Sequence, residues 1–456
     1  MKQKIYPVLK DTVRIKKMEA FCWVAELMSD SGIIASPGEC FILSLCNGQY
    51  KMPEIERIYG ETFQTDKKTA KKRVHDTLKK LAACIDFSEK PYKQKRRYMP
   101  ESFLYHARMQ ENNKRGRFET PAEAVLALTK NCNFRCIYCY NSSGTGKSTE
   151  LSTEQWLEAV RQMKALGVVK CTLTGGEPLL HPGFFEILET LVKNDILPYI
   201  CTNGSLLGEE AILKLHALKI PVVQISLDSA SPSEHDRMTC SAHTFPVITH
   251  AIERLVELGI KVYVKAVILP QNLDSTADLI TLCHSLGVSN LVLDRYDLSY
   301  SGRGGNYFFL SSEQNEKLKE IVRQKKEEIK DMNINLISGS RNWRCKEDIV
   351  MCGAFIQSFV IMSDGEYAVC EKLENIPEMS VGNFRDMPIG EMWKSKRIEE
   401  ITMPPKEQYD EPCRSCEHLS ECGSGCYAAK LFVTKRLYGP DPKCWRADYK
   451  NNQFID

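Results

Sequence analysis

The stretch Asn131–Asn141, which reads NCNFRCIYCYN, decides how the rest of the chain is interpreted. It contains Cys132, Cys136 and Cys139, separated by three residues and then by two. A structural zinc site uses four ligands, and a four-iron cluster uses four thiolates. No fourth cysteine follows this group within reach, so the pattern leaves one ligand position to be filled by something else.

The composition indicates a cytoplasmic protein of several domains. The chain has 456 residues, nineteen of them cysteine, and a formal net charge of +2. Its first residues, MKQKIYPVLKDT, lack the apolar core of a secretory signal, and no apolar run is long enough to span a membrane. We therefore expect no membrane contact, and we expect clustered cysteines to bind metal rather than to form disulfides.

One basic run stands out, but we expect no nucleic-acid partner. Residues 67–97 contain twelve Lys or Arg residues against three acidic ones. A solvated helix face followed by a linker explains this run better than a patch for an acidic peptide or a nucleic acid.

Changes in pattern divide the chain into four regions. Residues 1–92 combine a short hairpin with three helical segments, which predicts a winged-helix-like domain, and residues 93–118 form a linker. Residues 119–335 alternate β-branched runs with helices, and residues 336–456 are loop-rich, with many Cys, Gly and Pro residues. Such a loop-rich domain depends on metal for its stability.

The alternating region predicts an α/β fold with a partial (β/α)6 barrel. Its six strand candidates are AVLALT, VVKCTLT, LPYICTNG, PVVQISLD, KVYVKAVIL and NLVLDRY. Sites in such folds form at the carboxyl ends of the strands. The three-cysteine stretch follows the first strand directly and therefore belongs at this end.

Polar and glycine-rich motifs follow the next strands. The second strand ends in TGGEP, where Gly175 and Gly176 allow a close backbone approach to a ligand and Glu177 supplies a carboxylate for an ammonium group. Three further polar side chains end the third and fourth strands: Asn203 as an amide donor and acceptor, and Ser226 and Asp228 as partners for ribose hydroxyls.

Three interpretations of the cysteine stretch remain at this point. A zinc site would need a ligand such as His106 or His181, which are remote in sequence and lack zinc-like spacing. A disulfide with one odd thiol does not suit a reducing compartment. The third is a four-iron cluster whose open iron binds a ligand that is not protein.

The cysteine stretch and TGGEP together resemble the radical S-adenosylmethionine (SAM) superfamily. The resemblance implies a [4Fe-4S] cluster on Cys132, Cys136 and Cys139, with the amino and carboxylate groups of SAM on the open iron. It also implies that a 5′-deoxyadenosyl radical formed from SAM abstracts hydrogen from an unactivated carbon. Tyr138 would then pack near the adenine, Glu177 would hold the amino group, and Ser226 and Asp228 would lie near the ribose.

One motif departs from the family. Its peptide-modifying branch often has His-Asp-x-x-Arg-Gly after the fourth strand, and this chain has Thr239 and Cys240 in the last two places. Arg237 is the candidate to bind the SAM carboxylate, and the alternative is that it only caps a helix.

A second group of cysteines lies near the C-terminus. Its members are Cys345, Cys352, Cys370, Cys413, Cys416, Cys422, Cys426 and Cys444. From Cys352 onward, with Gly365 before Cys370, the order is similar to the seven-cysteine SPASM pattern of radical SAM peptide and protein maturases.

The SPASM resemblance implies two auxiliary [4Fe-4S] clusters, which makes three clusters in all. The first would be held by Cys345, Cys352, Cys370 and Cys426, and the second by Cys413, Cys416, Cys422 and Cys444. Two zinc-ribbon sites are the alternative, and without Cys345 the first cluster would keep an open iron. Glu371, beside Cys370, is the candidate base that takes a proton from substrate, or else an exposed hairpin glutamate.

The N-terminal region indicates the substrate class. It resembles the recognition element of enzymes that modify ribosomally made peptides (RiPPs), which bind a leader peptide as an added strand. We therefore expect a precursor peptide and an electron donor such as flavodoxin or ferredoxin as partners.

We expect the reaction to be formation of thioether cross-links from Cys to carbon. The alternatives are carbon–carbon cross-linking, epimerisation, formylglycine formation in a sulfatase, or a zinc-stabilised winged-helix DNA-binding regulator.

Overall fold

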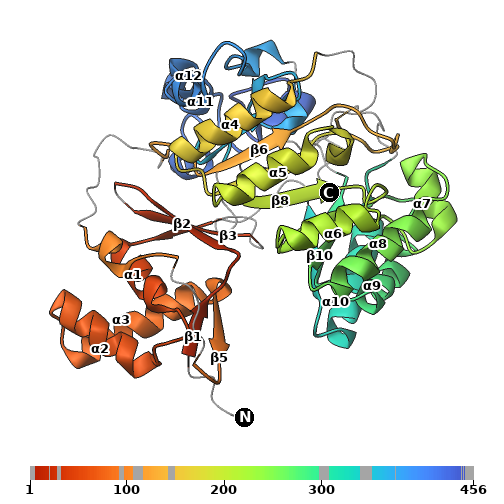
Figure 1. Ribbon diagram of the computed structural model, residues 1–456. Helices are drawn as coiled ribbons and strands as arrows, with labels where there is room; N and C mark the ends of the chain where they lie inside the picture. Colours follow the sequence, from red (N-terminus) through yellow and green to blue (C-terminus); the bar gives the residue numbers. More distant parts are fainter. Residues whose placement is uncertain are drawn as a thin grey trace. The chain divides into compact units, whose positions relative to one another are not determined.

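The computed structural model describes residues 6–19, 21–27, 32–91, 97–105, 117–141, 149–296, 308–338, 352–374, 376–442, 444 and 446. The chain divides into two compact units (Figure 1). The N-terminal unit comprises residues 1–114 with 167–170, and the C-terminal unit comprises residues 115–166 with 171–456. Each unit is described by itself.

The N-terminal unit combines five short strands with three helices. Its elements are β1 (Tyr6–Leu9), β2 (Val13–Lys17), β3 (Cys22–Glu26), β4 (Ile33–Ala35), α1 (Pro37–Leu45), α2 (Met52–Phe63), α3 (Lys67–Lys80) and β5 (Ile85–Ser88). Strands β2, β3 and β4 form an antiparallel sheet in that order, and β1 pairs with β5. The predicted strands at β2 and β3 and the three predicted helices are present, whereas β1, β4 and β5 were not predicted.

The helices of this unit begin where local chemistry predicts. Ser36 caps α1 and accepts from the backbone N–H of Glu39, whose carboxylate accepts in return from the N–H of Ser36. Asp66 caps the basic helix α3, and its side chain accepts from the backbone N–H groups of Lys68 and Thr69. The buried faces of the helices meet in a shared apolar core that contains Phe41, Ile55, Val74 and Leu81, among others. The basic residues of α3 lie on its exposed face, as the pattern predicts.

The C-terminal unit is built on a nine-stranded sheet with the order β12-β11-β10-β9-β8-β7-β6-β13-β14. Its strands are β6 (Glu123–Ala127), β7 (Lys170–Thr174), β8 (Leu197–Thr202), β9 (Val222–Ser226), β10 (Lys261–Ile268), β11 (Asn290–Arg295), β12 (Asn333–Ser338), β13 (Ser358–Ile361) and β14 (Tyr367–Ala368). Parallel pairing joins β8 to β12 in succession and also joins β6 to β13, whereas β13 and β14 form an antiparallel hairpin.

Helices connect the strands and cover the sheet. They are α4 (Thr153–Ala165), α5 (Phe184–Lys193), α6 (Glu209–Ala217), α7 (Pro232–Thr239), α8 (Phe245–Glu257), α9 (Thr276–Ser285) and α10 (Ser312–Glu328). Figure 1 shows α5 and α8 alongside the sheet, where they contact β8 and β10. The C-terminal region adds α11 (Ile389–Trp393), α12 (Lys396–Thr402), α13 (Leu419–Cys422), α14 (Tyr427–Ala429) and a π-helical turn at Lys430–Thr434.

The predicted α/β fold with a mostly parallel sheet is confirmed, and the sheet is larger than predicted. All six predicted strands are present as β6 to β11. Strand β12 extends one edge, and the hairpin of β13 and β14 extends the other edge through its pairing with β6. The sequence pattern predicts that hairpin, but not its place in the sheet, because strand pairing between distant segments leaves no local signal.

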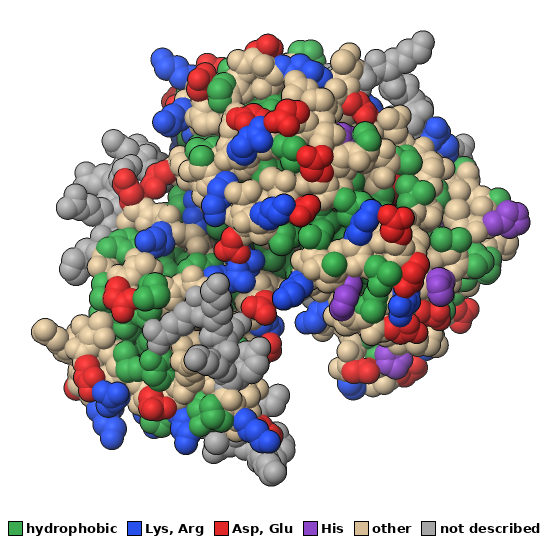
Figure 2. All heavy atoms as spheres, in the orientation of Figure 1, with side chains coloured by type: hydrophobic (Ala, Val, Ile, Leu, Met, Phe, Trp, Pro, Cys, Tyr) green, Lys and Arg blue, Asp and Glu red, His purple; other side chains and the backbone are tan. Residues whose placement is uncertain are grey.

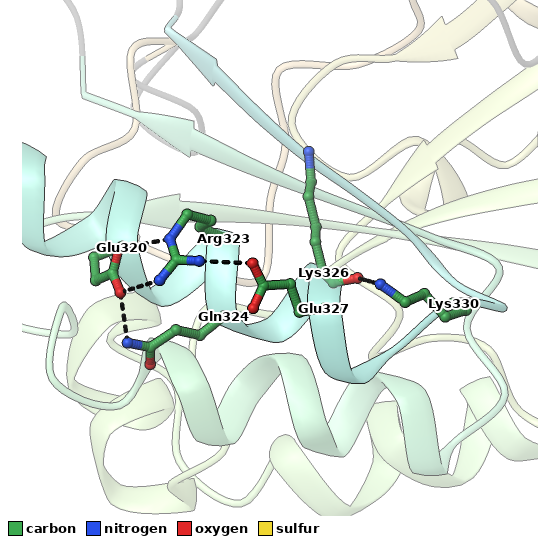
Figure 3. Close-up of polar contacts among 6 residues, drawn as sticks. All are labelled: Glu320, Arg323, Gln324, Lys326, Glu327 and Lys330. Atoms are coloured by element: carbon green, nitrogen blue, oxygen red, sulfur yellow. Dashed lines mark hydrogen bonds and ion pairs between the residues drawn. The ribbon is translucent and has the colours of Figure 1, made fainter.

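Helix α10 shows how charged residues support a surface element. It buries Leu318 and Val322, and its remaining faces are mostly polar. In Figure 3, Arg323 lies between Glu320 and Glu327, and Gln324 also donates to Glu320. Such pairs at spacings of three and four residues each add about 0.2–0.5 kcal/mol to a helix.

The surface carries both signs of charge. On the face that Figure 2 shows, Lys and Arg side chains are interspersed with Asp and Glu side chains. None of the helices in the described parts of the chain combines the length and the hydropathy needed to cross a membrane.

Candidate cofactor and cluster sites

The three-cysteine stretch begins as a continuation of β6 and is held there by the loop that follows β7. Leu128 N–H donates to the carbonyl of Thr174 at 2.9 Å, and Gly176 N–H donates to the carbonyl of Thr129 at 2.7 Å. One step further, Glu177 N–H donates to the carbonyl of Asn131 at 2.8 Å. The TGGEP motif and the approach to Cys132 are therefore side by side at the carboxyl end of the sheet.

The two glycines of TGGEP have a packing role in this arrangement. A Cβ on Gly175 would lie 2.4 Å from the carbonyl oxygen of Thr129, and one on Gly176 would lie 2.2 Å from that of Asn131. Gly175 also has a φ of +139°, which L side chains rarely adopt. Both positions need glycine so that this loop can contact the cysteine stretch, and a close approach to a ligand stays a prediction.

Helix α7 holds the other side of the stretch. Arg135 N–H donates to the carbonyl of Thr239 at 3.0 Å, and Ile137 N–H donates to that of Met238 at 2.9 Å. Cys240 ends the helix in the left-handed conformation, with a φ of 50°. The segment that departs from the family pattern thus supports the cysteine stretch through its backbone, and α7 itself was not predicted.

The three cysteines are half-buried and influence one another. Burial is the main cause that raises the pKa of the Cys132 and Cys136 thiols, and the charge of Cys139 adds to the shift at both. Phe134 N–H lies 3.4 Å from the Cys132 sulfur and can stabilise a thiolate there. Three crowded thiolates without a cation would repel one another, so the arrangement favours a bound metal centre.

Glu177 is fully buried and links two strand ends. Its Oε1 accepts from Thr202 Oγ1 at 2.7 Å, and its Oε2 accepts from the backbone N–H of Asn203 at 2.7 Å. Burial raises the pKa of Glu177 to about 7, against these hydrogen bonds, which lower it. Because Oε2 has one described donor, it retains a lone pair that can accept from an ammonium group.

Asn203 connects the third strand end to the cysteine stretch. Its side-chain amide donates to Asn133 Oδ1 at 2.9 Å, and its own Oδ1 accepts from Ser205 N–H at 2.9 Å. Asn133 in turn donates to Ser205 Oγ at 2.8 Å. The predicted donor and acceptor of the TNG motif are therefore used inside the fold, where they position the residue next to Cys132.

Tyr138 and Asp228 form a pair. The Tyr138 hydroxyl donates to Asp228 Oδ2 at 2.5 Å, and the backbone N–H of Val267 donates to Oδ1 at 2.9 Å. Asp228 is buried, and burial raises the pKa of its carboxyl group. The carboxylate therefore fixes the tyrosine of the cysteine stretch against β10, and its predicted contact with ribose hydroxyls stays a prediction.

Ser226 lies at the end of a strand and is half-buried, whereas Arg237 lies on a helix and is exposed. Ser226 is half-buried at the end of β9, in register with Lys265 of β10. Arg237 is exposed on α7, whose buried side chains are His235, Met238 and Thr239. Within the described residues, no hydrogen bond or ion pair joins the Arg237 side chain to the other predicted site residues.

One face of the sheet is polar and partly open. Along β7 to β10, buried residues alternate with half-buried ones, which include Thr174, Cys201, Ser226 and Lys265. The ammonium group of Lys265 lies 3.1 Å from Asp294 Oδ2 and interacts with Cys201 and Glu371. Burial lowers the pKa of Lys265, but Asp294, Cys201 and Glu371 together more than offset this, so the net shift is upward.

Glu371 belongs to this polar face. It begins a 3-10 turn directly after Cys370 and interacts with Thr174 and Lys265. Burial raises the pKa of its carboxyl group, and the two lysines Lys265 and Lys372 oppose the shift. Glu371 is therefore half-buried beside a lysine and not exposed, and its role as the base stays a prediction.

The C-terminal cysteines gather in two groups. Cys370 and Cys426 interact electrostatically with each other and with Cys352, and burial raises the pKa of both thiols. Cys345, the fourth predicted ligand of this first group, lies outside the described residues. In the second group, Cys413 interacts with the three other predicted ligands, which are Cys416, Cys422 and Cys444.

A buried lysine lies beside both groups. Lys430 interacts with Cys413, Cys422 and Cys426, and burial lowers its pKa to about 8 against the effect of Asp441 and these thiols. Arg446 adds a second cation, with a guanidinium nitrogen 3.5 Å from the Cys416 sulfur.

The donor chemistry at these sites fits iron–sulfur clusters. In the parts of the chain that the structure describes, no three Cys, His, Asp or Glu side chains converge on one point. A four-iron cluster binds each thiolate through a different iron, so its ligands surround it and need not converge. Thiols with nearby cations and backbone N–H groups are the surroundings that such anionic clusters require.

Sequence reasoning missed several residues that hold the cysteine stretch in place. Glu150 accepts from the Thr129 hydroxyl at 2.9 Å and from the Lys130 backbone N–H at 2.7 Å. Asn133 and Thr202 bond to Asn203 and Glu177. Thr202 and Asn203 adjoin each other in the sequence, so the polar end of β8 could have indicated Thr202. Glu150 had no local signal.

Comparison with known proteins agrees with this arrangement. Residues 126–283 match the radical SAM superfamily, and residues 352–417 match SPASM, an iron–sulfur cluster-binding domain. The chain is 27% identical to mycofactocin maturase MftC of Mycolicibacterium smegmatis over 343 residues, covering 74% of this chain and 86% of MftC. It is 29% identical to the antilisterial bacteriocin subtilosin biosynthesis protein AlbA of Bacillus subtilis over 322 residues, covering 70% of each.

A solved structure shares the fold over nearly the whole chain. Streptococcus suis SuiB, crystallised with SAM bound, superposes with a TM-score of 0.69 at 17% identity and covers 96% of this chain and 99% of SuiB. The chain therefore contains a radical SAM domain, which binds SAM and a [4Fe-4S] cluster, and an SPASM domain, which binds auxiliary iron–sulfur clusters.

Proposed function

We propose that this protein is a radical SAM peptide maturase that modifies a ribosomally made precursor peptide. The proposal rests on the polar face of the nine-stranded sheet in the C-terminal unit. The cysteine stretch is held at the carboxyl end of this sheet, and Glu371, which directly follows Cys370 of the C-terminal cysteines, lies against the same face at Thr174 and Lys265. With the assignments proposed below, this arrangement would put a SAM site and an auxiliary cluster around one reaction space. MftC and AlbA, named for maturation and bacteriocin biosynthesis, support the peptide class.

We assign the cofactor contacts as follows. Cys132, Cys136 and Cys139 would hold the SAM-binding cluster, and Glu177 would accept from the SAM ammonium group. Once bound, SAM and its cluster supply a 5′-deoxyadenosyl radical that abstracts a hydrogen atom from the peptide. The protein's part is to orient the peptide carbon and to exclude water from this space.

Glu371 is the proposed base. Its carboxylate lies between Thr174 and Lys265, so a proton accepted from a substrate thiol or carbon would be held close to a lysine ammonium group. An external electron donor such as flavodoxin or ferredoxin would supply the cluster with electrons.

The leader of the precursor peptide would bind to the N-terminal unit, which we interpret as a winged-helix-like recognition domain. Strand β4 is at the edge of its antiparallel sheet, and Ile34 on this strand is 56% exposed. An edge strand offers unpaired backbone N–H and C=O groups to an added strand, and an exposed apolar side chain offers a contact that fixes register. SuiB has been crystallised with its precursor peptide SuiA.

The reaction we propose is thioether formation from a cysteine sulfur to a peptide carbon. It would remove a proton from the thiol, which Glu371 would accept, and a hydrogen atom from the carbon, which the 5′-deoxyadenosyl radical would take up. Closing the carbon–sulfur bond would release one further electron, and an auxiliary cluster would accept it. Carbon–carbon cross-linking and epimerisation are the alternatives within the same peptide-maturase class.

The test uses the reconstituted enzyme with SAM, a reductant and the precursor peptide encoded next to its gene. Thioether formation predicts a product lighter by two hydrogens whose modified cysteine resists alkylation. A product that has lost two hydrogens but still alkylates at every cysteine would indicate a carbon–carbon link, and an unchanged mass with altered stereochemistry would indicate epimerisation. If no leader-bearing peptide reacted while SAM was cleaved, the peptide-maturase proposal would be wrong.

A further inference from the structure

Lys430 is a charged side chain without contact to solvent. It is fully buried, and its ammonium group donates to Ser424 Oγ. The same group lies 4.7 Å from the centroid of the Tyr427 ring, in a cation–π contact. A buried cation is costly unless anionic groups nearby compensate its charge, so its neighbours indicate its role.

The neighbours of Lys430 come from both C-terminal cysteine groups. Lys430 interacts with Cys413, Cys422 and Cys426. Cys426 belongs to the first group, and Cys413 and Cys422 belong to the second. One lysine therefore stands between two sets of sulfur ligands. No sequence motif drew attention to it.

Asp441 is the opposing charge at the same place. It is 2% exposed, and its Oδ2 accepts from the backbone N–H of Cys426 at 2.8 Å. Its own carbonyl accepts from the N–H of Cys444 at 2.8 Å, so its backbone and side chain contact one ligand of each group. Gly425 permits this position, because a Cβ there would lie 2.5 Å from Asp441 Oδ2.

Fixed charges beside an iron–sulfur cluster change its reduction potential. Reduction by one electron adds one negative charge, which a nearby cation stabilises and a nearby anion destabilises. The effect is large where burial excludes water and counter-ions, as it does at Lys430 and Asp441.

We propose that Lys430 and Asp441 are opposed positioning residues that set the reduction potentials of the two auxiliary clusters. Lys430 raises both potentials, and Asp441 lowers them. Together they fix the driving force with which the auxiliary clusters accept an electron. This inference rests on the proposed assignment of two clusters to the C-terminal cysteines.

The test is an anaerobic redox titration with dithionite, followed by electron paramagnetic resonance. A background that carries Cys132→Ala, Cys136→Ala and Cys139→Ala removes the SAM-binding cluster, so that only auxiliary signals titrate. In this background we compare the parent protein with Lys430→Met, with Asp441→Asn and with the double variant. Lys435→Met is the matched control, because Lys435 is exposed near the end of the same turn.

We expect opposite shifts from the two single variants. Lys430→Met should lower the auxiliary reduction potentials by at least about 59 mV, which corresponds to a tenfold change in the equilibrium constant of a one-electron reduction. Asp441→Asn, whose amide oxygen can still accept from Cys426, should raise them. The double variant should return toward the parent, and Lys435→Met should not shift them.

Potential shifts of the same sign in both single variants, or no shift in either, would overturn the inference. A general distortion of the structure would not give shifts whose sign depends on the charge that is removed. If Lys430→Met failed to assemble clusters, Asp441→Asn alone would still decide by the sign of its shift. Absence of auxiliary signals and of their iron in the parent would instead refute the two-cluster assignment, and this inference with it.

Discussion

At the scale of single residues, the carboxyl end of the sheet depends on buried carboxylates that the fold itself uses. Glu177 joins Thr202 to Asn203, Asp228 joins Tyr138 to Val267, and each therefore determines the position of a neighbour of the cysteine stretch. The residue types at these places were predictable from the motifs. Their partners were not, because each hydrogen bond joins different strands.

Protonation of Glu177 should make the free energy of unfolding depend on pH. Its pKa is about 7 in the folded chain and about 4.3 when unfolded, so the folded state binds more protons between these values. Stability from this group is therefore present at low pH and is lost as the pH rises from about 4.3 to about 7, by up to about 4 kcal/mol. Glu177→Gln removes this dependence.

The measurement is the unfolding midpoint without SAM at pH 5 and at pH 8. Glu177→Gln should have a lower unfolding midpoint than the wild type at both pH values, because its hydrogen bonds are mispaired. We expect this difference in midpoint to be larger at pH 5 than at pH 8. Glu186→Gln, an exposed substitution on α5, serves as control. An equal difference at both pH values would show that Glu177 does not titrate in this range.

At the scale of elements, the site is assembled by loops that touch through backbone atoms. The sequence predicts six strands and the helices between them because their periodicity is local. It did not predict α7, in which six of the eight residues are polar, although α7 holds Arg135 and Ile137. The structure shows the TGGEP glycines against Thr129 and Asn131, a contact that the sequence did not indicate, and their approach to a ligand stays a prediction.

Gly176→Ala should therefore disrupt the cysteine stretch selectively. The new Cβ would lie 2.2 Å from the Asn131 carbonyl, so the backbone before Cys132 must shift. We expect the variant to lose the SAM-binding cluster, about a third of the iron if three clusters are present, and to bind SAM at least tenfold more weakly. The auxiliary clusters should remain, as seen by iron analysis and electron paramagnetic resonance.

Gly208→Ala is the matched control for this change. Gly208 precedes α6 in the same unit, has an ordinary φ of −75°, and a Cβ there would meet nothing within 4 Å. It should keep its full iron content and SAM affinity. Full iron and normal SAM binding in Gly176→Ala would mean that the two loops can separate without cost to the cluster.

At the scale of the whole molecule, the proposed sites for leader binding and for the radical reaction belong to different units. The proposed cofactor residues all belong to the C-terminal unit, and the proposed leader-binding edge belongs to the N-terminal unit. If the leader is held as an added strand on β4, a charge at Ile34 should weaken peptide binding, because it places a polar group in an apolar contact.

Ile34→Asp should raise the dissociation constant for the precursor peptide at least tenfold, whereas cleavage of SAM without peptide and the iron content stay at wild-type levels. Phe87→Asp tests the same kind of substitution on β5, which pairs with β1 outside the β2–β3–β4 sheet and where Phe87 is 40% exposed. Binding is measured by fluorescence anisotropy with a labelled leader. Because both variants remove an exposed aromatic or aliphatic side chain from the N-terminal unit, equal losses would point to general destabilisation. If only Phe87→Asp lost affinity for the leader, the leader would bind at β5 and not at β4.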